Sequence, residues 1–159
     1  MLNFPDSPTI GQVFSGNRSS WVWDGVKWAI SANHPRYIMG CFVPGTIYTG
    51  QHLLVHRFSI DVTIPDEFGA YLGHVSQARS GVAVTADVVV QIIKALAASP
   101  GTFTAIGTIT IAAGTYTGVF VTTGAELSFS DGDTLALIAP VLEDATFADF
   151  AATLVGYES

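Results

Sequence analysis

The sequence of 159 residues contains a single cysteine, Cys41, which excludes an internal disulfide framework. A chain of this length fits one domain, or one domain with a small appendage, and it can bury a core without covalent staples. Cys41 lies between Gly40 and Phe42 in an apolar stretch, so we expect an inert buried thiol. The chain is not expected to be a small disulfide-stapled secreted scaffold.

Charge is also scarce, and one sign of charge is missing from a large part of the chain. Charged residues make up 12% of the sequence and hydrophobic residues 49%, so charge is well below the usual quarter or so. After Lys94 there are seven acids and no Lys or Arg, and the net charge is −7. Such a surface repels phosphate backbones, so no nucleic-acid partner is expected, and solubility explains the acids. Low charge with high apolar content is typical of surfaces that a partner subunit covers.

Long hydrophobic runs and targeting segments are lacking as well. The most apolar stretch, residues 82–98, is interrupted by Asp87, Gln91 and Lys94, so membrane insertion is not expected. The start, MLNFPDSPT, has neither the basic nor the apolar region of a secretory signal, which predicts synthesis in the cytoplasm.

The common catalytic patterns are absent too. The sequence has no GxSxG elbow, no phosphate-binding GxxxxGK[ST] loop, no GxGxxG and no HExxH. No pair of carboxylates has a spacing that singles it out for glycoside hydrolysis. We therefore expect neither an enzyme nor a cofactor.

What the chain does have is a cluster of tryptophans. All three lie within SWVWDGVKW, and Asp24-Gly25 at its centre is typical of a two-residue hairpin turn. That turn would pair Trp23 with Val26, Val22 with Lys27, and Trp21 with Trp28. Alternation then puts Trp21, Trp23, Val26 and Trp28 on one face, whereas a longer loop with Gly25 in a bulge would shift the pairing. An isolated hairpin is marginal, so its indole face should dock on the main domain, a neighbouring subunit or a larger particle.

From Tyr37 onward the chain reads as short strands rich in Val, Ile, Thr, Phe and Tyr, separated by Gly, Pro and Asp turns. The expected strands are 37–43, 53–64, 70–79, 82–94, 102–111, 116–121, 126–129, 134–139 and 147–157. Residues 86–99 could also form a helix capped at Thr85, but their β-branched run favours a strand. We predict an all-β fold: an N-terminal hairpin module in residues 1–35, followed by a jelly-roll-like antiparallel β-sandwich in residues 36–159.

Three groups of residues are candidate ligand sites. His52 and His56 lie four apart on an expected strand, about 13 Å, which is too far for one metal ion. Asp131 and Asp133, with Glu143 and Asp144 reached through the fold, lack the full calcium-loop pattern, and a tight turn explains them equally well. Phe103, Tyr116 and Phe120 could form a sugar-binding platform or belong to the core. No metal site is expected.

The first 28 residues resemble a short N-terminal module of tailed-bacteriophage structural proteins. Such modules read Asn-Phe-Pro-x-x-Pro-x-x-Gly-Gln, followed by a Trp-x-Trp-Asp-Gly-x-x-Trp hairpin. The matching residues are Asn3-Phe4-Pro5, Pro8, Gly11-Gln12 and Trp21 to Trp28. The later chain is similar to a β-sandwich of phage fibre and spike proteins through ADVVVQIIK, GTITIAAGTYTG, FSDGDTLALIAP and DATFADFAATLVGYES. Many such proteins carry a long shaft between the two parts, and residues 30–36 leave no room for one.

The resemblance implies a virion structural protein: a short homotrimeric fibre or spike attached to the capsid or tail, whose head contacts host surface glycans. The implied attachment surface is Phe4, Pro5, Trp21, Trp23, Val26 and Trp28. Two alternatives stay open, a capsid decoration protein of the same fold and a free carbohydrate-binding module. The implied partners are further copies of the chain, other virion proteins and a host glycan.

Overall fold

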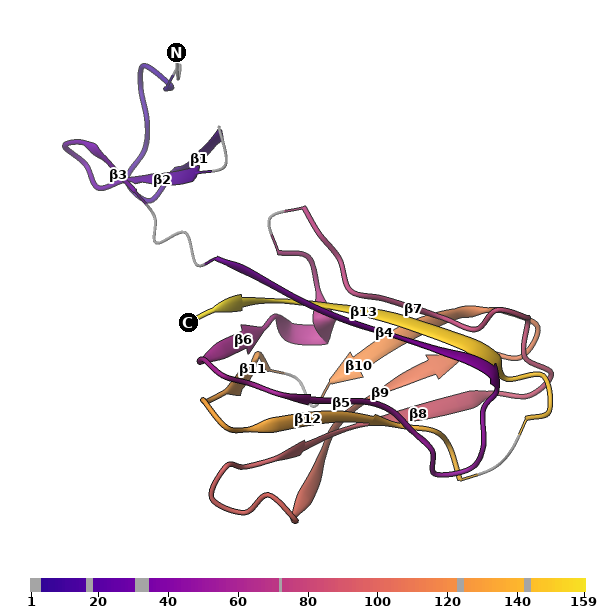
Figure 1. Ribbon diagram of the computed structural model, residues 1–159. Helices are drawn as coiled ribbons and strands as arrows, with labels where there is room; N and C mark the ends of the chain where they lie inside the picture. The colour runs from indigo at the N-terminus through magenta and orange to yellow at the C-terminus, as the bar shows by residue number, and fades with distance from the viewer. Residues whose placement is uncertain (1–3, 17–18, 31–34, 72, 123–124, 142–143) are drawn as a thin grey trace. The chain divides into compact units, whose positions relative to one another are not determined.

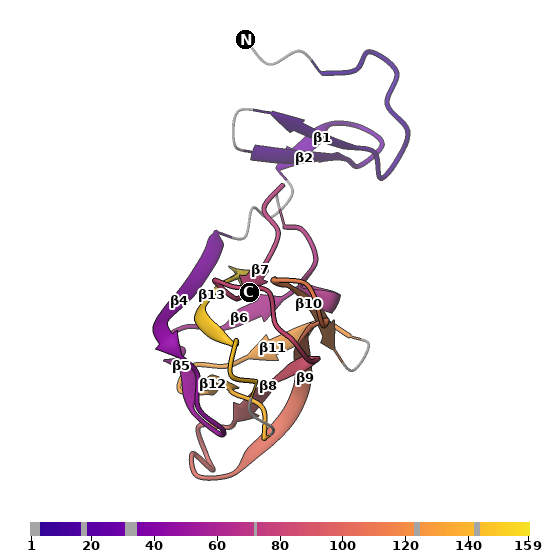
Figure 2. The same cartoon turned by 90° about the vertical axis from the view of Figure 1, so that its right-hand side faces the viewer.

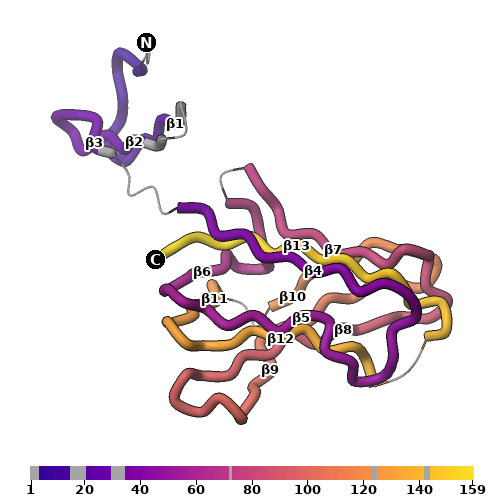
Figure 3. Tube along the Cα trace, in the orientation of Figure 1, coloured from indigo at the N-terminus to yellow at the C-terminus, as the bar shows by residue number. Residues whose placement is uncertain are grey.

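The structure is a computed structural model, and it describes residues 4–16, 19–30, 35–71, 73–122, 125–141 and 144–159. The chain divides into two compact units, Met1–Pro35 and Arg36–Ser159. Figure 3 follows the path of the chain through both units.

The small unit is a three-stranded antiparallel sheet. Its strands are β1 (Val13–Gly16), β2 (Ser19–Trp23) and β3 (Trp28–Ile30), in the order β1-β2-β3. The sequence predicted the hairpin of β2 and β3 but not β1. The third strand matters because three strands with an apolar face are roughly the minimum for a sheet that is stable by itself.

The large unit contains ten strands and one short 3-10 helix, η1 (Asp66–Phe68). The strands are β4 (Arg36–Thr46), β5 (His52–Arg57), β6 (Val62–Ile64), β7 (Gln77–Arg79), β8 (Val88–Ala95), β9 (Phe103–Ile111), β10 (Thr117–Thr122), β11 (Leu127–Phe129), β12 (Thr134–Ile138) and β13 (Ala148–Glu158). All their pairings are antiparallel. The predicted all-β class is confirmed.

The strand pairs of the large unit are nested in the way that defines a jelly roll. Strand β4 pairs with β13, β5 with β12, β7 with β10, and β8 with β9, so the chain forms one long hairpin that folds over on itself. Two four-stranded layers result, β4-β13-β7-β10 and β5-β12-β8-β9, joined where β10 pairs with β9 (Figures 1 and 2). The short strands β6 and β11 pair with each other, and β6 extends the end of β13.

The core lies between the two layers and follows the two-residue period of strands. On β8, Val88, Val90 and Ile92 are buried while Val89 and Gln91 between them are half-buried. This alternation confirms the strand interpretation of the segment 86–99 over Val88–Ala95, and the helical alternative is wrong. The largest fully buried side chains are Phe58, Phe68, Phe129, Phe147, Phe150, Ile64, Ile92, Ile109, Ile111, Leu135, Leu137 and Leu154.

Besides the strand expected at 82–94, which begins only at Val88, two predicted strands were too long. The strand expected at 53–64 is broken between β5 and β6, where the Phe58 N–H donates to the Asp133 carbonyl (2.9 Å). The strand expected at 70–79 shrinks to β7, because Tyr71 and His74 pair with each other across a turn in which Gly73 has a φ of 79°. Apolar composition marked these segments as β-like, but it does not reveal the local turn at Tyr71–His74 or the long-range partner of Phe58.

Carboxylates close several turns of the jelly roll. Asp144, on the connection before β13, accepts hydrogen bonds from the backbone N–H groups of Thr85 (2.9 Å), Ala86 (2.6 Å) and Thr146 (2.8 Å). The hydroxyls of Thr85 and Thr146 donate to the same carboxylate. Thr85 and Ala86 are therefore held outside β8, which starts six residues later than the predicted strand. Asp144 thus links the segment before β8, in one layer, to the segment before β13, in the other.

The hydrogen bond from the Thr146 hydroxyl, together with those from the backbone, holds the pKa of Asp144 far below its usual range despite burial. Because folding lowers this pKa, the hydrogen bonds to the ionised carboxylate stabilise the fold fully above the unfolded-state pKa of about 4. That stabilisation is lost as pH falls toward the folded-state pKa. We predict that Asp144→Asn lowers the free energy of unfolding at pH 7 by about 1–3 kcal/mol, because the amide NH₂ faces N–H donors.

Urea unfolding from pH 7 down to pH 3 measures this effect. The variant should lose less stability on acidification than the unmodified protein does. Asp131→Asn is the matched control, since the exposed Asp131 carboxylate accepts no recorded hydrogen bond in the described residues. Equal stability of Asp144→Asn and the unmodified protein at pH 7 would contradict the assigned role.

Candidate functional site

The tryptophan hairpin forms with a longer loop than the two-residue turn predicted. Strand β2 pairs with β3 so that Trp23 faces Trp28, Val22 faces Ala29 and Trp21 faces Ile30. The predicted pairs Trp23–Val26, Val22–Lys27 and Trp21–Trp28 are therefore wrong. Because the shift is by two residues, the three tryptophans still share one face, but Val26 leaves the strand and lies in the loop of residues 24–27.

The side chain of Asp24 explains the four-residue loop. Its Oδ1 accepts hydrogen bonds from the N–H groups of Val26 and Lys27, each at 2.8 Å, and these bonds lower the pKa of Asp24. The Asp24 N–H donates to the Lys27 carbonyl at 3.2 Å, while Gly25 takes a φ of 103° that other residues rarely adopt. A carboxylate that satisfies two loop amides favours this loop over a tight two-residue turn.

The indoles form a small aromatic core with two phenylalanines of the same unit. Phe4 stacks on Trp28 (ring centroids 5.2 Å apart) and meets Trp21 edge-on (5.3 Å) and Phe14 at a tilt (4.8 Å). Phe14 lies opposite Trp21 in the β1–β2 register. The face that the sequence left uncovered is thus partly covered by the unit's own Phe4, and all three indoles are half-buried.

The apolar side chains that the small unit leaves in solvent lie elsewhere. Val26 is 84% exposed at the loop tip and Ile10 is 79% exposed, with Ile10 packed beside Gly25. Pro5 is half-buried. Sequence reasoning missed Ile10 and Phe14, although Val13-Phe14, a β-branched and an aromatic residue in sequence, was a signal of a further strand. Asn3 lies outside the described residues.

The histidine and carboxylate candidates have structural roles in the described residues. His52 and His56 lie on β5 as expected, and His56 Nε2 is 2.8 Å from the Tyr37 hydroxyl; burial lowers the pKa of His56. Asp133 forms an ion pair with Lys94 (2.8 Å) and accepts hydrogen bonds from the Ala97 and Ser130 N–H groups. Those bonds outweigh burial, so the pKa of Asp133 is lowered.

Across the described part of the chain, no three His, Cys, Asp or Glu side chains are gathered as metal ligands. The Asp131-Gly132-Asp133 sequence forms a turn in which the Gly132 N–H donates to the Phe58 carbonyl. Glu143 of the calcium hypothesis lies outside the described residues.

The three aromatics considered for a sugar platform do not meet. Phe120 is buried and packs on Phe68 (4.8 Å). Phe103 and Tyr116 are exposed, but Phe103 starts β9 whereas Tyr116 precedes β10, at the opposite end of the β9–β10 hairpin. Phe120 is therefore a core residue, and the other two cannot serve one ligand together.

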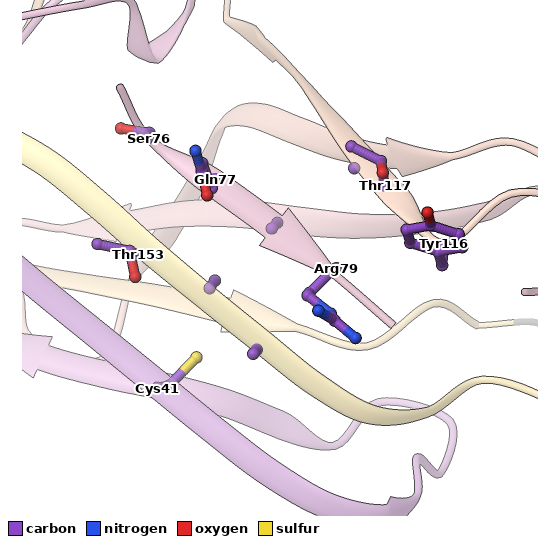
Figure 4. Close-up of a pocket in the computed structure, with 11 residues that line it drawn as sticks. Cys41, Ser76, Gln77, Arg79, Tyr116, Thr117 and Thr153 are labelled. Atoms are coloured by element: carbon purple, nitrogen blue, oxygen red, sulfur yellow. The ribbon is translucent and has the colours of Figure 1, made fainter. Parts of the chain in front are cut away.

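A groove crosses the layer β4-β13-β7-β10 and has a volume of about 430 Å³ (Figure 4). Its polar lining side chains are Ser76, Gln77, Arg79, Tyr116, Thr117 and Thr153, and we call it the Arg79 groove. Cys41 also lines it. The thiol is half-buried rather than fully buried as predicted, and burial raises its pKa, which keeps it in the unreactive protonated form at neutral pH.

Comparison with family models, curated proteins and solved structures finds no match to this chain. No helix in the described residues is long and apolar enough to cross a membrane.

All three tryptophans lie in the small unit, so tryptophan fluorescence reports on that unit alone. We predict that Phe4→Ala shifts the emission to longer wavelength and destabilises the small unit by about 1–3 kcal/mol, because Phe4 contacts two of the indoles. The far-UV circular dichroism transition of the jelly roll should stay unchanged.

Phe103→Ala is the control for this experiment, since Phe103 lies in the jelly roll and is exposed. Its emission spectrum should match that of the unmodified protein. An unchanged spectrum of Phe4→Ala would show that Phe4 does not shield the indoles.

Proposed function

We propose that this protein is a virion structural protein of a tailed bacteriophage, a short homotrimeric fibre or spike. In this proposal the small unit attaches the protein to the capsid or tail, and the jelly roll projects and contacts host surface glycans. The protein acts by binding and assembly rather than by catalysis.

The observation that carries the proposal is that the residues of the phage-module resemblance build one folded unit. Phe4, Trp21 and Trp28 pack on one another, and Asp24 closes the loop between the last two. The rings are used to hold the unit together, which favours an adaptor over a free carbohydrate-binding module with open indole faces. The exposed Ile10 and Val26 are then the apolar contacts offered to the particle, beside the half-buried edges of Trp21, Trp23, Trp28 and Pro5.

The outer face of the layer β5-β12-β8-β9 supports self-association. The register puts Val55, Ala136, Ile93 and Ala105 in one apolar row across all four strands. Ala136 and Ile93 belong to this outer face because they alternate with the core residues Leu135, Leu137 and Ile92. One neighbouring row consists of His52, Ile138, Gln91 and Thr108, and the other of Arg57, Thr134, Ala95 and Phe103. The three rows together contain one charge, Arg57.

A solvent-facing side of an antiparallel sheet normally carries polar and charged residues, whereas this one has an apolar central row, with Val55 exposed and Ala136 and Ile93 buried, and one charge in three rows. Because the chain has a net charge of −7, copies of it repel one another least when they meet through a face without acids. We therefore place this face toward the three-fold axis of the proposed trimer.

Light scattering after size exclusion tests the trimer. The expected mass is three times the 16.7 kDa of one chain. Val55→Glu should yield the single-chain mass, because it places an acid in the apolar row. Val119→Glu is the matched control: Val119 is 62% exposed on the other layer, against 58% for Val55, and the trimer should persist. A single-chain mass for the unmodified protein would overturn the trimer.

Attachment is tested by adding purified protein to phage particles assembled without it. Val26→Asp should lower the amount retained on the particles at least tenfold, because it puts a charge at the exposed tip of the small unit. Val141→Asp is the control, since Val141 is 83% exposed, but in the jelly roll. Equal retention of both variants would contradict attachment through the loop of residues 24–27.

The same particles separate the spike from the decoration alternative. Bound protein at a few unique positions on the tail or at vertices supports the spike. Bound protein on every lattice position of the capsid supports a decoration protein of the same fold.

A further inference from the structure

The polar side chains of the Arg79 groove form two adjacent rows on the outer face of the layer β4-β13-β7-β10. Thr117, Arg79 and Ala151 lie opposite one another in the first row, and Gln77 lies opposite Thr153 in the second. Exposed Gln77 and Arg79 flank the buried Ala78, as strand alternation requires. Figure 4 shows Gln77 and Arg79 on β7, Thr153 on β13, and Thr117 and Tyr116 at the start of β10.

A small residue in the outer row, Ala151 opposite Arg79, leaves space in the groove. Ala78, Ala152 and Gly118 also line it, but they lie in the row between, where the side chains of Ala78 and Ala152 are buried in the core. The resulting volume of about 430 Å³ lies within the range of about 300–1,000 Å³ that is usual for small-molecule sites.

The guanidinium of Arg79 is the charged group of the groove and is available to a ligand. Its recorded contact in the described residues is the ring of Tyr116, 6.0 Å from the Arg79 Cζ, and no ion pair engages it there. No acid lines the groove. Asp149, two residues before Ala151 on β13, is occupied by a hydrogen bond from the Gly45 N–H (2.7 Å).

These groups match one class of ligand. A guanidinium binds a carboxylate through two parallel hydrogen bonds, while Gln77, Thr117 and Thr153 can donate to and accept from hydroxyl groups. The rings of Tyr116 and Phe42 add flat apolar surface; Phe42 lies opposite Ala151 on β4 and is 63% exposed. A phosphate would be better served by several cations or a nest of backbone N–H groups, and an apolar acid would not use three neutral polar side chains.

We propose that the Arg79 groove binds a carboxylated saccharide, with Arg79 on the carboxylate and Gln77, Thr117 and Thr153 on the sugar hydroxyls. This inference rests on the proposed function, in which the jelly roll contacts host glycans, and it names their chemical class. The net charge of −7 does not forbid an acidic ligand, because exposed charges beyond about 8–10 Å are largely screened at physiological salt.

The experiment is titration calorimetry of the full chain with three polymers: a polyuronate, a polysialic acid, and the same polyuronate with its carboxyl groups reduced to alcohols. The unmodified protein should bind at least one of the two carboxylated polymers and not the reduced one. Arg79→Gln should weaken binding about 10- to 100-fold, as expected for loss of a charged hydrogen-bonded pair. Arg79→Lys should bind with intermediate affinity, because a lysine supplies the charge without the paired donors.

Arg36→Gln is the matched control, because Arg36 is an exposed cation at the start of β4 that does not line the groove. It should bind like the unmodified protein, and all variants should keep the same thermal unfolding temperature. Equal weakening by Arg36→Gln would show general attraction of polyanions and overturn the site. Dissociation of the trimer by Arg79→Gln would assign Arg79 to a subunit contact and also overturn it.

Failure of this inference is distinguishable from failure of the proposed function. Binding of the reduced, neutral polymer as strongly as the acidic one would overturn the carboxylate site and leave a glycan-contacting spike intact. Absence of the protein from virions would remove the proposed function, whatever the protein binds in the calorimeter.

Discussion

Carboxylates that accept hydrogen bonds from backbone amides are the interaction on which this structure most depends. In the described residues eight of the thirteen acids do so: Asp24, Asp61, Asp66, Glu67, Asp87, Asp133, Asp144 and Asp149. A jelly roll needs its turns closed, because most of its strands pair with one far along the sequence. With one cysteine and no helix beyond η1 in the described part, these charge-assisted bonds hold the turns together.

This use of acids explains how a chain with so few charges is arranged. Asp133 and Asp144 are buried, and Asp149 is half-buried, so much of the excess of acids after Lys94 is structural rather than a means of solubility. Because these acids lie at turns, the outer faces of the two layers carry little charge. A face with an apolar central row and no acids in its rows suits a contact between copies of an acidic chain, and a face with one unpaired guanidinium suits an anionic ligand. The proposed trimer and the Arg79 groove both follow from that placement.

The sequence predicted the elements well where composition and period agreed. The β-branched run in residues 86–99 indicated a strand because such side chains fit a pleated surface, and β8 confirms it. Strand ends were less predictable, since they depend on partners far along the chain: Asp144 holds Thr85 and Ala86 outside β8 from almost sixty residues away. The hairpin register failed for a local reason, because the carboxylate of Asp24 binds two loop amides.

The candidate sites, too, could be predicted from the sequence only in part. The shared face of the three tryptophans followed from alternation, but its cover by Phe4 did not, since nothing in the local sequence says where a leading segment folds back. The Arg79 groove could not have been found from the sequence: Gln77, Thr117 and Thr153 come from three strands that only the nested pairing brings together.

The most direct test of the central claim is mass spectrometry of purified, infectious virions of the phage that encodes this chain, with quantification of copies per particle. The account predicts that the chain is present, in a copy number divisible by three. Virions that are complete and infectious but lack the chain would contradict it.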